Sequence, residues 1–303
     1  MEESSQEEGL FGGDLITFPC RESARADWSQ RIIQAAKDFL RGHEPQDVRE
    51  VSLDKYDPRE LAGGRALLVL HCDPRESLED LNEDVWAKWG PVLLRYNIPT
   101  TAREQTVHQI LLRQAYDKAP EPILQAIPIL LDKEDETDLP GQHILRNLDP
   151  IWDNDIADCL TTKAQDDELG PELWVGIINS LIAHGVESGE NMARRALDNI
   201  VLNSGKICPR ALGSASALLQ YSDDGGWETV FPAMEKNEDF SRKMLSQAVR
   251  NERLKPDKLA AKLKDIQLAD LFIHMSKLWP ETGSSSLTDK EHGDMIRFRP
   301  TRK

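Results

Sequence analysis

The chain has 303 residues, of which 39% are hydrophobic, and its 53 acidic residues outnumber its 37 basic ones to give a formal net charge of −16. This length and composition allow a substantial core and exclude an intrinsically disordered chain, while so acidic a surface repels phosphate backbones, so a nucleic-acid partner is not expected. Leu, Ala, Ile and charged residues dominate, and Val and Thr form no alternating runs, which favours an all-α fold.

The sequence also argues against a membrane span and a disulfide framework. No apolar run approaches the ~18 to 20 residues that cross a bilayer, and residues 1–8 are acidic where a secretory signal would be basic. The widely spaced cysteines form no CxxC pair, which indicates reduced thiols and no zinc knuckle; they are Cys20, Cys72, Cys159 and Cys208. We therefore expect a cytoplasmic protein without redox chemistry.

Residues 1–27, rich in Glu, Ser and Gly, are predicted to be a flexible lead. A helix follows and ends near Gly42, with Pro45 just beyond. Residues 66–70 are an apolar run that fits either a helix or a strand. Two amphipathic segments come next, and the first has a break at Gly90–Pro91. The apolar positions of the first segment are Val85, Trp86, Trp89, Val92, Leu93 and Tyr96, and those of the second are Val107, Ile110, Leu111 and Ala115.

From residue 121 onward, helices and short linkers alternate. A helix around 123–127 is followed by an acidic linker over 133–138 and by helical segments around 144–148 and 156–160. Two helix pairs follow, 173–182 with 192–201 and 211–219 with 227–234, and turns this short make paired helices antiparallel. Corresponding helices lie ~38 residues apart, within the ~33 to 47 residues of two-helix repeats. Two more helices are predicted at 240–249 and 268–278.

This pattern predicts an all-α fold, an α-solenoid of antiparallel helix pairs like a HEAT or armadillo superhelix, over residues 28–280, with a sub-boundary near 120–140. Each pair buries its apolar stripes only against its neighbours, so the repeats form an extended surface suited to large partners. Residues 281–303 are predicted to be a polar and basic tail, whose last basic residues are expected to be solvated; they are Arg297, Arg299, Arg302 and Lys303.

Residues 173–280 carry a recurring order of aromatic residues and prolines. Trp227 follows a Gly-rich turn, Val230-Phe231-Pro232 comes next, Phe240 follows a charged turn, and the helix 268–273 leads to Trp279-Pro280. This order resembles the degenerate HEAT-like repeat arm that follows the nucleotide-binding domain in bacterial STAND NTPases of the NACHT type. In that family's late repeats a polar loop and an arginine-led helix come next; here the loop is 281–290, the arginines are Arg297 and Arg299, and the sequence ends there.

The resemblance implies a sensor or scaffold arm whose partner is a protein, either a P-loop NTPase or a foreign protein ligand. The nucleotide-binding motif itself is missing. The pair Gly205–Lys206 is followed by Ile207, and Ile200 stands where the first glycine of a P-loop should be. We therefore expect no ATP hydrolysis, and the chain is interpreted as a separated arm or a partner subunit.

The strongest catalytic candidate is His71-Cys72-Asp73. If residues 60–73 formed a strand of a small α/β domain, His71 and Cys72 could act as base and nucleophile of a thiol enzyme. No second His or Cys belongs to a nucleophile motif, so we favour the alternative that these are buried structural residues. The histidines show no HExxH or HxxxH pair, and the acidic groups around 135–138 and 153–158 lack the EF-hand pattern. No catalytic, cofactor or metal site is predicted; the other histidines are His43, His108, His143, His184, His274 and His292.

The tryptophans are expected to pack in the core, and those that are exposed are candidate binding residues. They include Trp86, Trp89, Trp174, Trp227 and Trp279. The leading hypothesis is thus a non-catalytic helical repeat protein for protein recognition, sensing or scaffolding. The alternatives are the thiol enzyme and a helical adaptor unrelated to NTPases.

Overall fold

The computed structural model describes residues 26–53, 57–73, 78–96, 102–137, 143–202, 207–222, 226–249 and 263–279. These residues form thirteen α-helices and one 3-10 turn and no strand, which confirms the all-α prediction. The chain divides into two compact units, 1–177 and 178–303, and the division falls within helix α9 (Pro171–Ala183). The antiparallel solenoid stays a prediction. The expected lead, except for its last two residues, and the expected tail lie outside the described residues.

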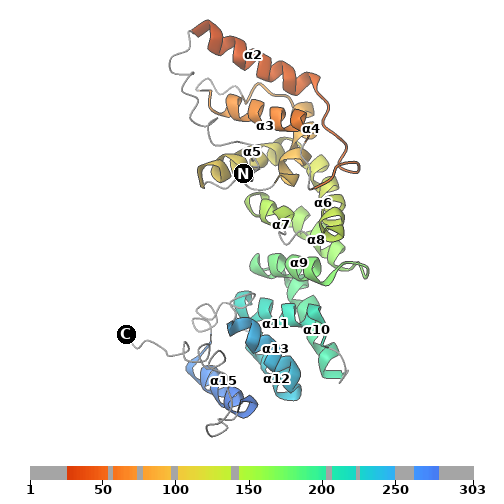
Figure 1. Ribbon diagram of the computed structural model, residues 1–303, viewed down its shortest axis with the longest axis vertical. Helices are drawn as coiled ribbons and strands as arrows, with labels where there is room; N and C mark the ends of the chain where they lie inside the picture. The colour runs from red at the N-terminus through yellow and green to blue at the C-terminus, as the bar shows by residue number, and fades with distance from the viewer. Residues whose placement is uncertain are drawn as a thin grey trace, which may run out of the picture. The chain divides into compact units, whose positions relative to one another are not determined.

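The first unit is built around α4, which contacts α3, α5, α6 and α7 (Figure 1). Trp86 and Trp89 of α4 are fully buried, so their predicted core role is confirmed. The helices of this unit before α9 are α2 (Ala26–Gly42), α3 (Pro58–His71), α4 (Glu83–Arg95), α5 (Ala102–Lys118), α6 (Pro120–Glu136), α7 (His143–Leu148), the 3-10 turn η1 (Asp149–Ile151) and α8 (Asn154–Ala164).

The ambiguous run 66–70 is part of a helix, so the strand on which the thiol-enzyme alternative depended is wrong. Two local signals start α3: the Asp57 carboxylate accepts from the Arg59 amide at 2.7 Å, and Pro58 occupies the first turn. Gly63 then leaves room for a neighbour, since a Cβ there would lie 1.9 Å from the Trp89 ring. The run has no polar face because each of residues 66–70 is buried or half-buried.

Two predicted interruptions are also wrong. The helix α4 continues through Gly90–Pro91; an interior proline costs ~3 kcal/mol, but burial of the apolar side chains before and after it outweighs this cost at ~1.5 to 3 kcal/mol each. The acidic linker begins later than expected, since residues 133–136 belong to α6 and the Glu134 side chain is buried. Residues 138–142 lie outside the described part of the chain.

In the second unit, α11 packs against α10, α12 and α13. Its residues 211–220 are all buried, which explains why that stretch contains only small, apolar and uncharged residues. Gly226 begins α12 next to α11, where a Cβ would lie 2.4 Å from the Leu218 carbonyl oxygen. The helices after α9 are α10 (Glu187–Leu202), α11 (Pro209–Tyr221), α12 (Gly226–Lys236), α13 (Glu238–Val249) and α15 (Asp265–Leu278).

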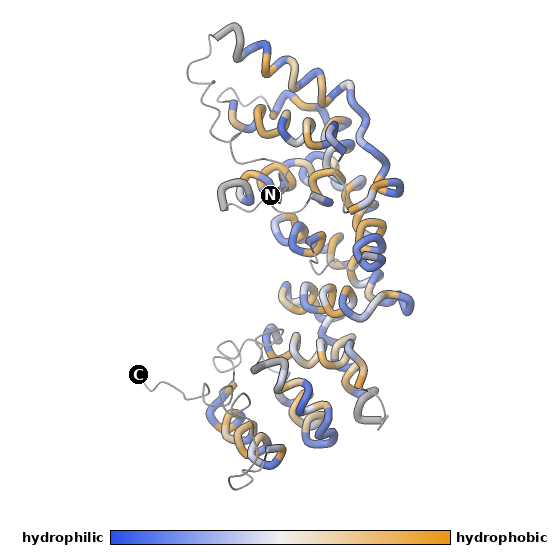
Figure 2. The backbone as a smooth tube through the Cα atoms, viewed as in Figure 1, coloured by the Kyte–Doolittle hydropathy of each residue, from blue (hydrophilic) through white to orange (hydrophobic). Residues whose placement is uncertain are grey.

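Hydrophobic and hydrophilic residues alternate along most of these helices (Figure 2). This is the pattern of helices that bury one face and expose the other. None of the helices in the described residues combines the length and the apolar composition needed to cross a bilayer.

Candidate functional site

The His71-Cys72-Asp73 candidate lies at the C-terminal end of α3. Cys72 is the helix cap, and its amide donates to the Leu68 carbonyl at 3.0 Å. All three residues are half-buried, and burial lowers the pKa of His71. Because Cys72 ends a helix and does not follow a strand, the nucleophile geometry expected of the thiol enzyme is not present.

The densest group of buried polar side chains surrounds the C-terminal end of α4, within the first unit. The last carbonyls of a helix have no partner inside it and need one from elsewhere when they are buried. The ring Nε2 of His108 contacts the Leu93 carbonyl at 2.8 Å. The amide nitrogen of Asn147 donates to the carbonyls of Leu94 and Tyr96 at 2.7 and 2.8 Å. Side chains of α5 and α7 therefore cap α4.

Two acidic residues complete this α4 cap. The Arg95 guanidinium pairs with the buried Glu60 carboxylate of α3 and lies 5.6 Å from the Tyr96 ring centre. The Nε2 of His143 contacts the Arg95 carbonyl at 3.2 Å, and its Nδ1 lies 3.1 Å from Glu134. Four helices besides α4 therefore contribute to the α4 cap: α3, α5, α6 and α7.

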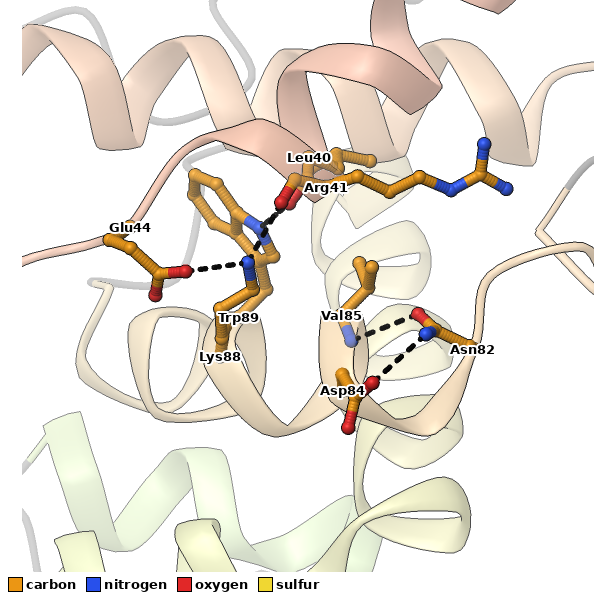
Figure 3. Close-up of polar contacts among 8 residues, drawn as sticks. All are labelled: Leu40, Arg41, Glu44, Asn82, Asp84, Val85, Lys88 and Trp89. Atoms are coloured by element: carbon orange, nitrogen blue, oxygen red, sulfur yellow. Dashed lines mark hydrogen bonds and ion pairs between the residues drawn. The ribbon is translucent and has the colours of Figure 1, made fainter.

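The same arrangement recurs at the end of α2. The Trp89 indole donates to the Leu40 carbonyl at 3.1 Å, and the Lys88 ammonium donates to the Arg41 carbonyl at 3.0 Å and pairs with Glu44 at 2.9 Å (Figure 3). Asn82 begins α4 by accepting from the Val85 amide at 3.4 Å (Figure 3). Side chains of α4 thus donate to the carbonyls at the end of α2, in the same way that side chains of α5 and α7 contact the carbonyls at the end of α4.

Two further helix ends follow this rule. The Trp174 indole donates to the Ala164 carbonyl, the last of α8, at 3.0 Å. The Ser241 hydroxyl of α13 donates to the Met234 carbonyl in the last turn of α12 at 2.7 Å. Buried polar side chains in both units therefore satisfy the carbonyls at helix ends.

Ser241 also contacts His274 of α15, which gives a buried serine and histidine 2.9 Å apart. A nucleophilic serine must donate its hydrogen to the histidine ring. The Ser241 hydroxyl has one hydrogen and the Met234 carbonyl can only accept, so that hydrogen goes to the carbonyl and the His274 Nε2 donates to Ser241. Burial lowers the pKa of His274, which favours the neutral ring. The hydrogen bond therefore links α15 to α13 and does not activate Ser241 as a nucleophile.

Asp153 and Asp135, from the two acidic groups singled out in the sequence, have structural partners. Asp153 begins α8 by accepting from the Ile156 amide at 3.0 Å, and Tyr116 donates to it at 2.7 Å. Asp135 accepts from the Gly170 amide at 2.7 Å. Among the described residues, no group of three or more His, Cys, Asp or Glu side chains could hold a metal ion. Gly205–Lys206 falls outside them.

The structure shows which of the singled-out tryptophans is exposed. Trp227 is buried and stacks on Phe231 at 4.5 Å, and Trp174 is buried, whereas Trp279 is 36% exposed, with the Arg242 guanidinium 5.6 Å from its ring centre. Trp279 directly follows α15. Four of the six large apolar side chains that are exposed in the described residues belong to α15 or follow it: Ile266, Phe272, Ile273 and Trp279. We call these four the α15 outer face.

No sequence motif predicts a role for Glu60, Arg95, Glu134 or Asn147, and the histidines His108 and His143 belong to no metal-binding pair in the sequence. One signal was present: His108 occupies a position of the stripe that continues with Leu111 and Leu112, all buried. A polar residue inside an apolar stripe indicates a buried group that must find a partner. Which group pairs with the His108 ring is decided by the tertiary packing.

Comparisons of this chain with protein-family models, with curated proteins and with solved structures found no match.

Proposed function

We propose that the chain is a non-catalytic helical repeat protein that acts as a scaffold by binding other proteins, with the α15 outer face as a contact surface. The observation that carries this proposal is the exposure of Ile266 (70%), Phe272 (72%) and Ile273 (52%). Contiguous exposed apolar groups mark sites of protein interaction, and aromatic residues are enriched at their centres.

The buried polar groups support the non-catalytic part of the proposal. The His108 and His143 rings contact the carbonyls that end α4, and the Ser241 hydroxyl donates to a carbonyl that ends α12. A catalytic site requires polar groups that converge on a substrate. Here the polar groups converge on the backbone. The resemblance to the repeat arm of STAND NTPases adds a P-loop NTPase or a foreign protein as the proposed binding partner.

Site-specific photo-crosslinking in intact cells tests this function. A photoreactive residue at Phe272 should give a protein adduct, which mass spectrometry identifies, whereas the same residue at the exposed Glu228 of α12 should give none. Equal crosslinking at both positions, or none at Phe272, contradicts the proposed contact surface. A P-loop NTPase or a foreign protein in the adduct would support the STAND relationship.

A further inference from the structure

The buried charges of the α4 cap balance only when one of its histidines carries a proton. Four ionisable side chains of this cap are buried: Glu60, Arg95, Glu134 and His143. The Arg95 guanidinium pairs with Glu60, which leaves Glu134 as a second buried carboxylate. Within the part of the chain that the structure describes, His143 is the ion-pair partner of Glu134. A buried charge without a partner is strongly destabilising, so a neutral His143 would leave the α4 cap with one uncompensated negative charge.

The hydrogen bonds of the His143 ring lead to the same result. Its Nδ1 lies 3.1 Å from a Glu134 carboxylate oxygen, and its Nε2 lies 3.2 Å from the Arg95 carbonyl oxygen. An ionised carboxylate and a carbonyl only accept hydrogen bonds, and a neutral imidazole carries hydrogen on one ring nitrogen. A neutral ring would therefore turn a lone pair towards one of the two oxygens. The charged ring has hydrogen on both nitrogens and donates to both oxygens.

The contacts of Glu134 place the proton on the ring and not on the carboxylate. The Glu134 oxygen that faces the ring also accepts from the backbone amide of His143 at 2.7 Å. Two hydrogen bonds to one carboxylate favour its ionised form. The other carboxylate oxygen is buried and has no hydrogen-bond partner among the described residues, so the ring is the group that compensates the charge of Glu134.

The other charged groups that the structure describes around α7 are compensated or at least partly open to solvent. The helix α7 packs against α4, α6 and η1. From α4 comes Arg95, whose charge Glu60 compensates, while Asp149 of η1 and Arg146 of α7 are exposed. The charged neighbours of Glu134 on α6 are exposed or half-buried: Asp132, Lys133, Asp135 and Glu136. Solvent and salt screen such charges, so Glu134 determines the charge of the ring.

We propose that the α4 cap binds one proton at neutral pH, on His143, and that loss of this proton weakens the attachment of α7 to α4 and α6. In an unfolded chain, histidine is mostly neutral above about pH 6.5. Above that pH the folded chain therefore holds one proton more than the unfolded chain. The stability that the pair contributes is present below about pH 6.5 and is lost as the pH rises, by up to about tenfold in the folding equilibrium constant per pH unit. This device lies in the first unit and does not depend on the α15 outer face.

Nuclear magnetic resonance of the full chain with isotope-labelled histidine tests the proton directly, because the chemical shift of each ring nitrogen reports whether it carries hydrogen. The signals of His143 are those that the His143→Gln variant lacks. At about pH 7.5, where an unfolded histidine is mostly neutral, both ring nitrogens of His143 should carry hydrogen. In Glu134→Gln, which replaces the carboxylate by an uncharged amide, only one should do so. Hydrogen on a single ring nitrogen of His143 in the original chain overturns the proposal.

Urea unfolding between about pH 7 and 8.5 measures the effect on stability. The folding equilibrium constant of the original chain should fall more steeply with pH than that of Glu134→Gln, by up to about tenfold per pH unit. The matched control Glu136→Gln removes an exposed carboxylate of the same helix and should keep the original slope. Equal slopes for the original chain and Glu134→Gln overturn the proposal. If Glu134→Gln does not fold, the ring-nitrogen measurement on the original chain decides.

Discussion

The clearest quantitative prediction concerns Asn147, which caps two buried carbonyls at the end of α4. Its amide group makes both hydrogen bonds at 2.7 and 2.8 Å, and its side chain is almost fully buried. Asn147→Ala removes two hydrogen bonds of ~1 kcal/mol each and leaves two buried acceptors unpaired, which costs ~1 to 3 kcal/mol more. Because alanine has a higher helix propensity than asparagine, the substitution also stabilises the helix by ~0.5 kcal/mol. We expect a net loss of about 3 kcal/mol in the free energy of unfolding.

Urea unfolding followed by circular dichroism measures this loss. With a slope of about 2 to 3 kcal/mol per M, the midpoint should fall by about 1 M. Asn191→Ala is the matched control, because Asn191 is exposed on α10, and it should change the free energy by less than ~0.5 kcal/mol. If the two variants unfold at the same urea concentration, Asn147 does not cap α4 in the way described.

Two further predictions concern the same unit. Burial lowers the pKa of His108 below 6.5, so the unfolded chain binds the proton more tightly than the folded chain, and the stability that His108 contributes above about pH 6.5 is lost at lower pH by up to ~1.4 kcal/mol per pH unit. In urea unfolding, the His108→Gln variant should therefore lose less stability than the original chain between about pH 6.5 and 5. Equal losses in the two proteins would contradict this. Gly63→Ala should destabilise the protein by ~1 to 3 kcal/mol, because the new Cβ would lie 1.9 Å from the Trp89 ring. The control Gly42→Ala should be neutral or slightly stabilising in thermal melts, because no atom lies within 4 Å of a Cβ at that position. Similar melting temperatures for the two variants would refute the close contact at Gly63.

The sequence was enough to predict the helices whose apolar residues are confined to one face. The helix predicted to end near Gly42 is α2, and its apolar residues Ile32, Ala36, Phe39 and Leu40 recur at helical spacing. Periodicity failed at residues 66–70, because all five are apolar and none of them is exposed. There the helix is indicated by Asp57–Pro58, a start signal that lies nine residues before the apolar run.

The α4 cap could be predicted only in part. Pattern alone shows that His108 is a polar residue in an apolar stripe, but it does not show which carbonyl the ring contacts. Glu134 was placed in an acidic linker because its neighbours are acidic, whereas in the structure its side chain is buried and contacts His143. Local composition describes an average segment, while tertiary contacts decide which single acidic residue is buried.

Helix-end capping by neighbouring helices has a consequence for how the two units respond to mutation. The bonds of Asn147 and His108 lie within residues 1–177, and the α15 outer face belongs to residues 178–303. Effects of mutations that share no partners add independently. Asn147→Ala should therefore lower the urea midpoint without changing the adduct formed by a photoreactive residue at Phe272, and Phe272→Asp should leave the urea midpoint unchanged. If Asn147→Ala abolished the adduct at Phe272 in a chain that is still folded, the two units would be energetically coupled, and the α4 cap would then control partner binding as well as stability.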